Sequence, residues 1–128
     1  MRVLLDSHAF IWLAEEPEKL SRSLLQLLQS SQTNLFLSVV SEWELLIKEQ
    51  KGKLKLHIGI MGMVEREMEA WQLQRLPVLH DHIHQYATLP LHHRDPFDRM
   101  LIAQAMAEDL TLVTADALFR RYNVKTIW

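Results

Sequence analysis

Residues 93–105 have the sequence His93-Arg94-Asp95-Pro96-Phe97-Asp98-Arg99-Met100-Leu101-Ile102-Ala103-Gln104-Ala105. Asp95 is a favourable N-cap residue, and Pro96 suits the first helical position, where its missing N–H would have no partner. Asp98 then falls at the third helical position, beside unpaired backbone N–H groups and the positive end of the helix dipole. The apolar residues that follow predict a helix buried against a large neighbouring layer.

A short strand is predicted soon after this helix, at residues 111–114, and it leads directly to Asp116. The chain begins in a similar way, because residues 2–6 form a continuous apolar run that ends on Asp6. Both segments are typical of buried strands of a parallel sheet, which carry apolar residues on both faces. The sequence therefore predicts at least two buried strands that each end at an acid.

Strands and helices alternate along the rest of the chain. The pattern predicts helices at residues 7–14, 21–29, 41–48, 57–70, 80–87 and around 118–119, and strands at 34–38, 76–79 and 124–127. Ser41 is the expected N-cap of its helix, and Pro77 favours an edge position for the strand that contains it. This alternation indicates a parallel sheet covered by helices on both faces.

The length and composition of the chain limit the classes of protein to which it can belong. At 128 residues, the chain (1–128) is expected to form a single domain, and its 48% hydrophobic content is typical of a soluble globular protein. It has no cysteine, which excludes disulfides and thiolate metal sites. The longest apolar run, Ala9 to Ala14, is far too short to span a membrane, and Asp6 comes too early for a signal peptide. We therefore expect a cytoplasmic protein with no membrane segment.

Four acids map to the same edge of the predicted sheet. Asp6 and Asp116 follow strands, Glu44 lies one turn into a helix that follows a strand, and Asp98 begins a helix that leads back to a strand. Carboxylates that converge at low dielectric repel one another unless a cation is bound, and oxygen ligands select hard ions such as Mg²⁺ or Mn²⁺. Each acid also has a structural alternative as a helix cap, with Ser41 and Glu44 forming a capping box.

Histidines offer a second possible metal set. His80, His82 and His84 would share one face of a strand, but only the first and last would share a face of a helix. Zinc also needs a third ligand, and no cysteine is available, so solvated histidines are the preferred interpretation. His92 and His93 precede the central helix and could contact a substrate there, although the sequence does not require it.

The net charge of −2 gives no general basic field, so binding of nucleic acid would have to be local. Arg94 and Arg99 flank the acidic stretch and are the candidates for holding a phosphate near a metal ion. The lysines that follow the helix at 41–48 are most simply a solvated helix end, with a phosphate track as the alternative; they are Lys48, Lys51, Lys53 and Lys55.

The chain resembles the PIN-domain ribonucleases, and within them the VapC-type toxins of bacterial toxin–antitoxin pairs. Four motifs carry the resemblance over nearly the whole chain. They are Leu4-Leu5-Asp6-Ser7-His8, Ser38-Val39-Val40-Ser41-Glu42-Trp43-Glu44-Leu45, Asp95-Pro96-Phe97-Asp98-Arg99-Met100-Leu101-Ile102-Ala103-Gln104-Ala105 and Leu112-Val113-Thr114-Ala115-Asp116. Each motif alone is weak, whereas the four in this order and at this spacing are specific.

The resemblance implies a three-layer α/β/α sandwich around a parallel sheet of about five strands. It also implies an endoribonuclease in which Asp6, Glu44, Asp98 and Asp116 are catalytic and hold Mg²⁺ or Mn²⁺. RNA would be the substrate, an antitoxin protein the partner, and a homodimer the expected assembly. Many members carry a further acid or asparagine after the last motif, where this chain has Ala117 and Leu118, which weakens the expectation of a second metal ion.

Other classes fit less well. A receiver-type signalling domain needs adjacent acids after the first strand, and a haloacid-dehalogenase-like phosphatase needs an aspartate where His8 stands. A PIN module that has lost most of its catalysis and acts by binding protein or RNA remains an open alternative, although the four acids favour an active enzyme.

Overall fold

The computed structural model describes all residues from 1 to 128, and its centre is a sheet of five parallel strands in the order β3-β2-β1-β4-β5. The strands are β1 (Arg2–Leu5), β2 (Asn34–Ser38), β3 (Gln74–Leu76), β4 (Thr111–Val113) and β5 (Thr126–Ile127). Every pairing in the sheet is parallel, so the carboxyl ends of all strands lie at one edge. The chain reverses its direction of travel across the sheet between β1 and β4, the switch point at which such sheets bind ligands.

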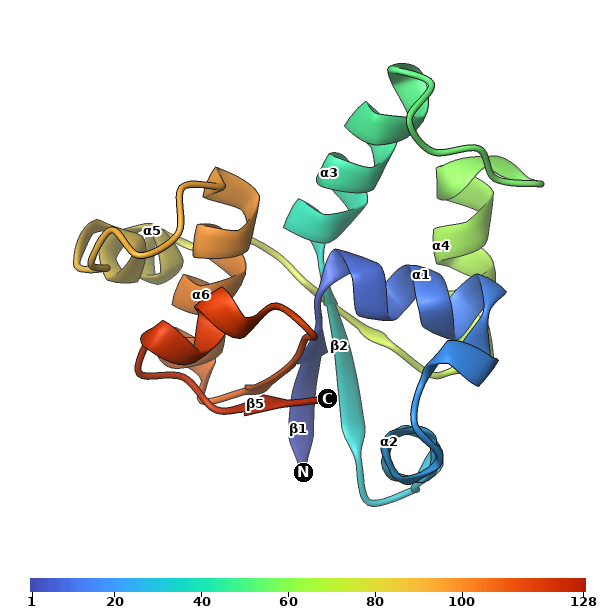
Figure 1. Ribbon diagram of the computed structural model, residues 1–128, viewed down its shortest axis with the longest axis horizontal. Helices are drawn as coiled ribbons and strands as arrows, with labels where there is room; N and C mark the ends of the chain where they lie inside the picture. Colours follow the sequence, from blue (N-terminus) through green and yellow to red (C-terminus); the bar gives the residue numbers. More distant parts are fainter.

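Helices cover the two faces of this sheet (Figure 1). They are α1 (Ser7–Glu15), η1 (Pro17–Lys19), α2 (Arg22–Gln29), α3 (Val39–Gln50), α4 (Gly59–Ala70), α5 (His80–Ala87), α6 (Pro96–Glu108) and η2 (Ala117–Arg121). The predicted three-layer α/β/α sandwich around a five-stranded parallel sheet is confirmed. None of these helices has both the length and the apolar character that crossing a membrane requires.

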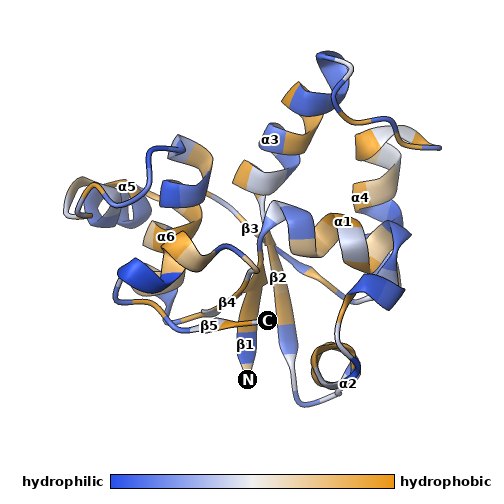
Figure 2. Ribbon diagram, in the orientation of Figure 1, coloured by the Kyte–Doolittle hydropathy of each residue, from blue (hydrophilic) through white to orange (hydrophobic).

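The core is split by the sheet into two apolar clusters. Val3 and Leu5 point from β1 into the cluster that α1, α2 and α4 cover. Leu4 points to the opposite face, where it packs with the buried stretch of α6. Figure 2 shows the apolar colouring of β1 and β2 between these two helical layers. The continuous apolar run that predicted a buried strand thus supplies side chains to both cores.

The start of α6 has the predicted geometry. The Oδ1 atom of Asp95 accepts hydrogen bonds from the backbone N–H groups of Phe97 and Asp98, and Pro96 is the first helical residue. Asp98 is therefore the third helical residue. Its side chain is fixed at the carboxyl edge of the sheet, because α6 runs from that edge back to the start of β4.

The predicted start of α3 is wrong by three residues. Ser38 is the N-cap, and its Oγ atom accepts from the N–H of Val40 and donates to Gln104 Oε1 at 2.6 Å. Ser41 is instead buried inside the first turns, and its hydroxyl has no hydrogen-bond partner. Glu44 is therefore the sixth helical residue and belongs to no capping box, which leaves its carboxylate available for other contacts.

Two edge strands differ from their predicted positions. β3 comprises Gln74–Leu76, where it pairs with β2, and Pro77 follows it. The prediction at residues 76–79 was wrong because it followed the apolar side chains, of which Val78 and Leu79 are exposed. The last strand, β5, is shorter than predicted, and η2 is a 3₁₀ helix.

His82 contradicts the prediction that the histidines of α5 are solvated. Its side chain is fully buried, with Nδ1 accepting from the N–H of Leu79 and Nε2 lying 2.7 Å from Glu108 Oε1. His80 and His84 are exposed, as expected. The three rings do not form a metal set, because His82 points into the core beside Gln104 while the other two face solvent.

Candidate active site

A pocket of about 430 Å³ opens at the carboxyl edge of the sheet, beside the switch point of strand order. All four predicted acids contribute to its wall: Asp6, Glu44, Asp98 and Asp116. They come from four different segments of the chain, namely the ends of β1 and β4, the second turn of α3 and the first turn of α6. The topology of the sheet is what brings these distant acids together.

Asp6 is both a cap and a member of the pocket. Its Oδ1 atom accepts a hydrogen bond of 2.7 Å from the N–H of Ala9, so it is the N-cap of α1. Burial raises the pKa of the Asp6 carboxyl above its ordinary value, and hydrogen bonds from Thr114 and Ala9 oppose that rise. The structural and the chemical interpretations of Asp6 are therefore compatible.

Glu44 reaches the pocket from α3 and is held on two sides. The hydroxyl of Ser7 donates to its Oε1 atom at 2.5 Å, which joins the start of α1 to α3. The Nζ atom of Lys48, one turn further along α3, lies 3.7 Å from its Oε2 atom. Lys48 also lines the pocket, so one positive charge stands at the rim of the acidic cluster.

Asp98 has the most perturbed carboxyl group of the site. Burial raises its pKa to about 7, and the negative charges of Asp95 and Glu44 act in the same direction. His93 opposes the rise, while the charge of Asp6 adds to it. In the absence of a cation, the pocket therefore retains a proton near neutral pH that an ordinary aspartate would have lost.

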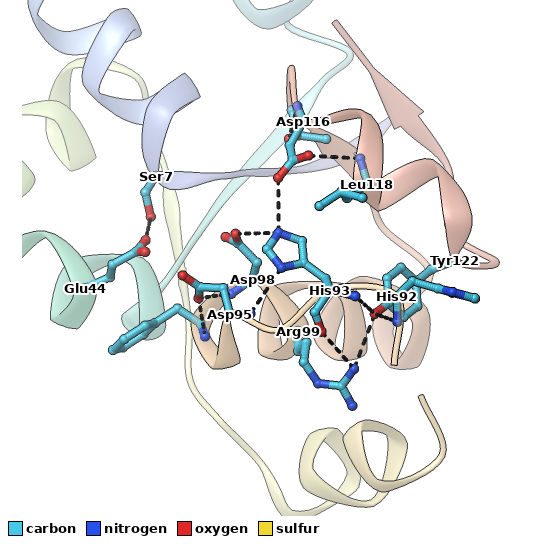
Figure 3. A network of polar contacts seen from close by, with 12 residues as sticks. Ser7, Glu44, His92, His93, Asp95, Asp98, Arg99, Asp116, Leu118 and Tyr122 are labelled. Atoms are coloured by element: carbon cyan, nitrogen blue, oxygen red, sulfur yellow. Dashed lines mark hydrogen bonds and ion pairs between the residues drawn. The ribbon is translucent and has the colours of Figure 1, made fainter. Parts of the chain in front are cut away.

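His93 lies between two of the acids (Figure 3). Its Nε2 atom is 3.0 Å from Asp98 Oδ2 and 3.1 Å from Asp116 Oδ2. Asp116 itself caps η2 through a hydrogen bond from the N–H of Leu118 to its Oδ1 atom. The imidazole is thus a link between the start of α6 and the segment after β4.

The two arginines have different environments. Arg99 is buried and does not line the pocket; its Nη1 atom donates to the carbonyl oxygens of Pro90 and His93 and to Tyr122 Oη. Figure 3 shows its guanidinium group directed away from the carboxylates. This environment gives Arg99 a structural function under the loop before α6, so only the exposed Arg94 is kept as a candidate for contact with phosphate.

Side-chain atoms of the site form two groups that could hold a divalent cation. Glu44, Asp95 and Asp98 each offer an oxygen within 4.8 Å of the others, and His93, Asp98 and Asp116 form a second such group. Asp6 belongs to neither group but lines the same pocket. Because burial and neighbouring charge raise the pKa of Asp98, a bound cation would relieve a real electrostatic cost. The residues fit a hard ion with oxygen ligands.

The fold and this pocket define a class of α/β domains that carry an acidic site at the switch point of a parallel sheet. The family model described as PIN domain matches residues 3–125, so the chain belongs to the PIN domain family.

Among curated proteins, Ribonuclease VapC22 of Mycobacterium tuberculosis is 26% identical over 130 residues, which cover 98% of each protein. Among solved structures, VapBC2 from Rickettsia felis bound to a DNA fragment from the promoter has a TM-score of 0.79 at 18% identity and covers 99% of this chain and 98% of that one. VapBC-1 from nontypeable Haemophilus influenzae has a TM-score of 0.68 at 16% identity, with 99% and 97% covered. At these identities the structures establish a shared fold.

Several residues of the site were not assigned to it from the sequence. Ser7 and Lys48 follow acids of the first two motifs at short spacing, which is a usable signal once the acids are known. Asp95 was expected only as an N-cap, and the structure places it in the pocket wall as well. His93 was considered only as a possible substrate contact, because its partner Asp116 lies 23 residues away in the sequence.

Proposed function

We propose that this protein is a metal-dependent endoribonuclease and the toxin of a type II toxin–antitoxin pair. The observation that carries the proposal is the convergence of Asp6, Glu44, Asp98 and Asp116 in one pocket of a PIN domain. The names of its relatives, a ribonuclease of the VapC type and proteins of VapBC pairs, support the substrate class and the partner.

The four acids would hold Mg²⁺ or Mn²⁺, directly or through water. An ion held there would supply a more acidic water and would stabilise charge that develops on the leaving oxygen of an RNA phosphodiester. Asp98 would lose its proton when the ion binds, because the cation lowers the pKa that burial has raised.

Other side chains of the pocket prepare it for this chemistry. The Ser7 hydroxyl fixes one oxygen of Glu44 and leaves the second oxygen near Lys48. Lys48 and the exposed His8 stand at the rim, where a positive or hydrogen-bonding group would contact the phosphate backbone. Arg94, exposed beside the N-cap of α6, is the further candidate for such a contact.

The antitoxin would restrain the enzyme by covering the acidic edge, and a basic side chain placed among the carboxylates would be the simplest means. The chain carries a net charge of −2, and its pocket is acidic, so a basic partner segment is complementary to it. Both the RNA substrate and such a partner imply that the protein acts in the cytoplasm.

A homodimer is the proposed assembly. An apolar groove of about 540 Å³ lies between α3, α5 and α6, and Trp43 on its wall is 61% exposed beside Phe97. An exposed tryptophan packed against a half-buried phenylalanine in such a groove is typical of a protein contact. Size-exclusion chromatography with light scattering should give twice the monomer mass, and Trp43→Glu should give the monomer.

Expression in a bacterial host tests the function as a whole. The intact protein should arrest growth, Asp98→Asn should not, and co-expression of the adjacent small open reading frame should relieve the arrest. Absence of toxicity from the intact protein, expressed at the same level as the variant, would instead favour a PIN module that acts by binding alone.

A further inference from the structure

Hydrogen bonds hold the imidazole of His93 in one orientation and select one tautomer of the neutral ring. Its Nδ1 atom accepts a hydrogen bond of 3.1 Å from the backbone N–H of Asp95. A ring nitrogen that accepts cannot carry a proton, so the proton of the neutral imidazole is on Nε2. That nitrogen faces Asp98 Oδ2 and Asp116 Oδ2, which means that one N–H group is shared by two carboxylates.

This form of His93 donates a hydrogen bond and cannot ligate a metal ion through Nε2. A ligating nitrogen must offer its lone pair, and the lone pair of this ring is on Nδ1, where the Asp95 N–H occupies it. His93 therefore has the geometric position of a ligand in the group that it forms with Asp98 and Asp116, but the wrong tautomer for that task.

The loop that precedes α6 carries His93, and hydrogen bonds to the buried side chains of Tyr122 and Arg99 hold it in place. Backbone N–H groups of His92 and His93 donate to Tyr122 Oη at 3.0 and 2.7 Å. Arg99 donates from Nη1 to the same oxygen and to the carbonyl of His93. Arg99 and Tyr122 are 8% and 5% exposed, so the ring is fixed by the interior of the fold.

We propose that His93 is a positioning residue that occupies the place of a second cation. Its Nε2–H group holds Asp98 and Asp116 together, so the site binds one divalent ion tightly, on the side of Asp98 that faces Glu44. This inference rests on the proposed function. It adds that one ion is bound tightly and that His93 is the residue that limits the number to one.

Two independent features support a single ion. Oxygen atoms of Glu44 and Asp98 lie within 4.8 Å of each other in a group that does not involve His93. On the other side, the residues after Asp116 are Ala117 and Leu118, which offer no ligand that could compensate for the protonated nitrogen. A second ion there would have only the two carboxylates that the imidazole already bridges.

The test is a count of Mn²⁺ bound to the full chain, by titration with detection of free Mn²⁺ by electron paramagnetic resonance. The parent should bind one ion tightly. His93→Ala removes the bridging donor and opens the space between Asp98 and Asp116, so it should bind two. His93→Gln places an amide N–H at a similar reach and should restore a count of one. His92→Ala, a neighbouring exposed histidine, is the matched control and should also bind one.

Two tightly bound ions in the parent would overturn this inference and leave the ribonuclease proposal standing, whereas no bound ion would overturn both. If His93→Ala does not fold, the ¹⁵N spectrum of the histidine rings of the parent tests the proposal, because it shows which ring nitrogen of His93 carries the proton. In chelator, His93 should carry its proton on Nε2 and have an unprotonated Nδ1, and this pattern should persist when Mn²⁺ is replaced by diamagnetic Mg²⁺. A proton on Nδ1 in the Mg²⁺ form would contradict the proposal.

Discussion

Asp95 Oδ1 accepts a hydrogen bond of 3.1 Å from the backbone N–H of Asp98, so one carboxylate fixes the residue that carries the other. The same oxygen accepts from the N–H of Phe97, which gives Asp95 two bonds within the first turn of α6. The two aspartates stand side by side in the pocket wall, yet only Asp98 leaves both of its carboxylate oxygens clear of the helix cap.

Amide substitutions should therefore separate these neighbours. Asp98→Asn should lower RNA cleavage by about 10²–10³-fold, since it removes a charged group that acts on the reacting centre. Asp95→Asn should keep most of the activity and the stability, because asparagine caps a helix about as well as aspartate. Initial rates and thermal unfolding of both purified variants measure the two effects.

Asp95→Ala serves as the control for the cap, with an expected loss of about 1 kcal/mol in the free energy of unfolding. Equal losses of activity in Asp95→Asn and Asp98→Asn would mean that Asp95 takes part in the chemistry directly.

The raised pKa of Asp98 predicts an unusual dependence of stability on pH in chelator. The folded protein retains this proton up to about pH 7, whereas the unfolded chain releases it near the ordinary value of 3.8. Between these values the folded state binds more protons, so the stabilising contribution is complete below pH 3.8 and is lost as the pH rises through about 7. Burial raises the pKa of Asp6 in the same direction.

Asp98→Asn removes this titration and isolates its effect. The free energy of unfolding from urea titrations should favour the variant over the parent more strongly at pH 8 than at pH 5. Binding of Mg²⁺ to the parent should weaken below about pH 7, because protons then compete for Asp98. A difference between variant and parent that is the same at both pH values would contradict the raised pKa.

The sequence predicted those parts of the site that local chemistry determines. Asp95 followed by Pro96 specifies a helix start without reference to the rest of the chain, and the structure has it there. Ser41 was predicted as the N-cap of α3, but the structure has Ser38 in that position. The choice of Ser38 depends on Gln104, which is 66 residues away and accepts from its hydroxyl. No local pattern contains that contact.

Two histidines also have contacts that local sequence patterns could not predict. His82 looked like a solvated residue of a polar helix, but the buried Gln104 and the partly exposed Glu108 provide polar partners for it from α6. His93 acquires its place from Asp116, and its tautomer from a backbone N–H two residues along the chain. These assignments need the tertiary structure, because the partners come from other elements of the fold or depend on the exact path of a loop.

Asp6→Asn tests the acidic cluster without an assay of RNA. Asparagine preserves the cap of α1 and removes a buried charge, so in chelator at neutral pH the variant should be as stable as the parent or more stable by up to about 1 kcal/mol. Mg²⁺ should raise the melting temperature of the parent by mass action and that of the variant much less. Asp6→Ala should lose about 1 kcal/mol with the cap.

A destabilised Asp6→Asn together with melting curves of the parent that do not respond to Mg²⁺ would mean that Asp6 is only a cap.

Arg94 and Arg99 should respond differently to truncation. Arg94→Ala removes an exposed charge and should raise KM for RNA by about tenfold at unchanged kcat and melting temperature, if it contacts phosphate as proposed. Arg99→Ala leaves the buried Tyr122 hydroxyl and two carbonyl oxygens with fewer partners and should cost about 1–3 kcal/mol of stability. Steady-state kinetics and thermal unfolding distinguish them, and an unchanged KM in Arg94→Ala would remove it from the site.

The most direct test of the central claim is cleavage of total RNA by the purified protein in chelator and after Mg²⁺ or Mn²⁺ is restored, beside Asp98→Asn prepared in the same way. The four convergent acids predict no cleavage in chelator, cleavage when either ion is added, and almost none by the variant under any condition. Full activity in excess chelator, or equal activity in the variant, would contradict the claim that these acids form a metal-dependent ribonuclease site.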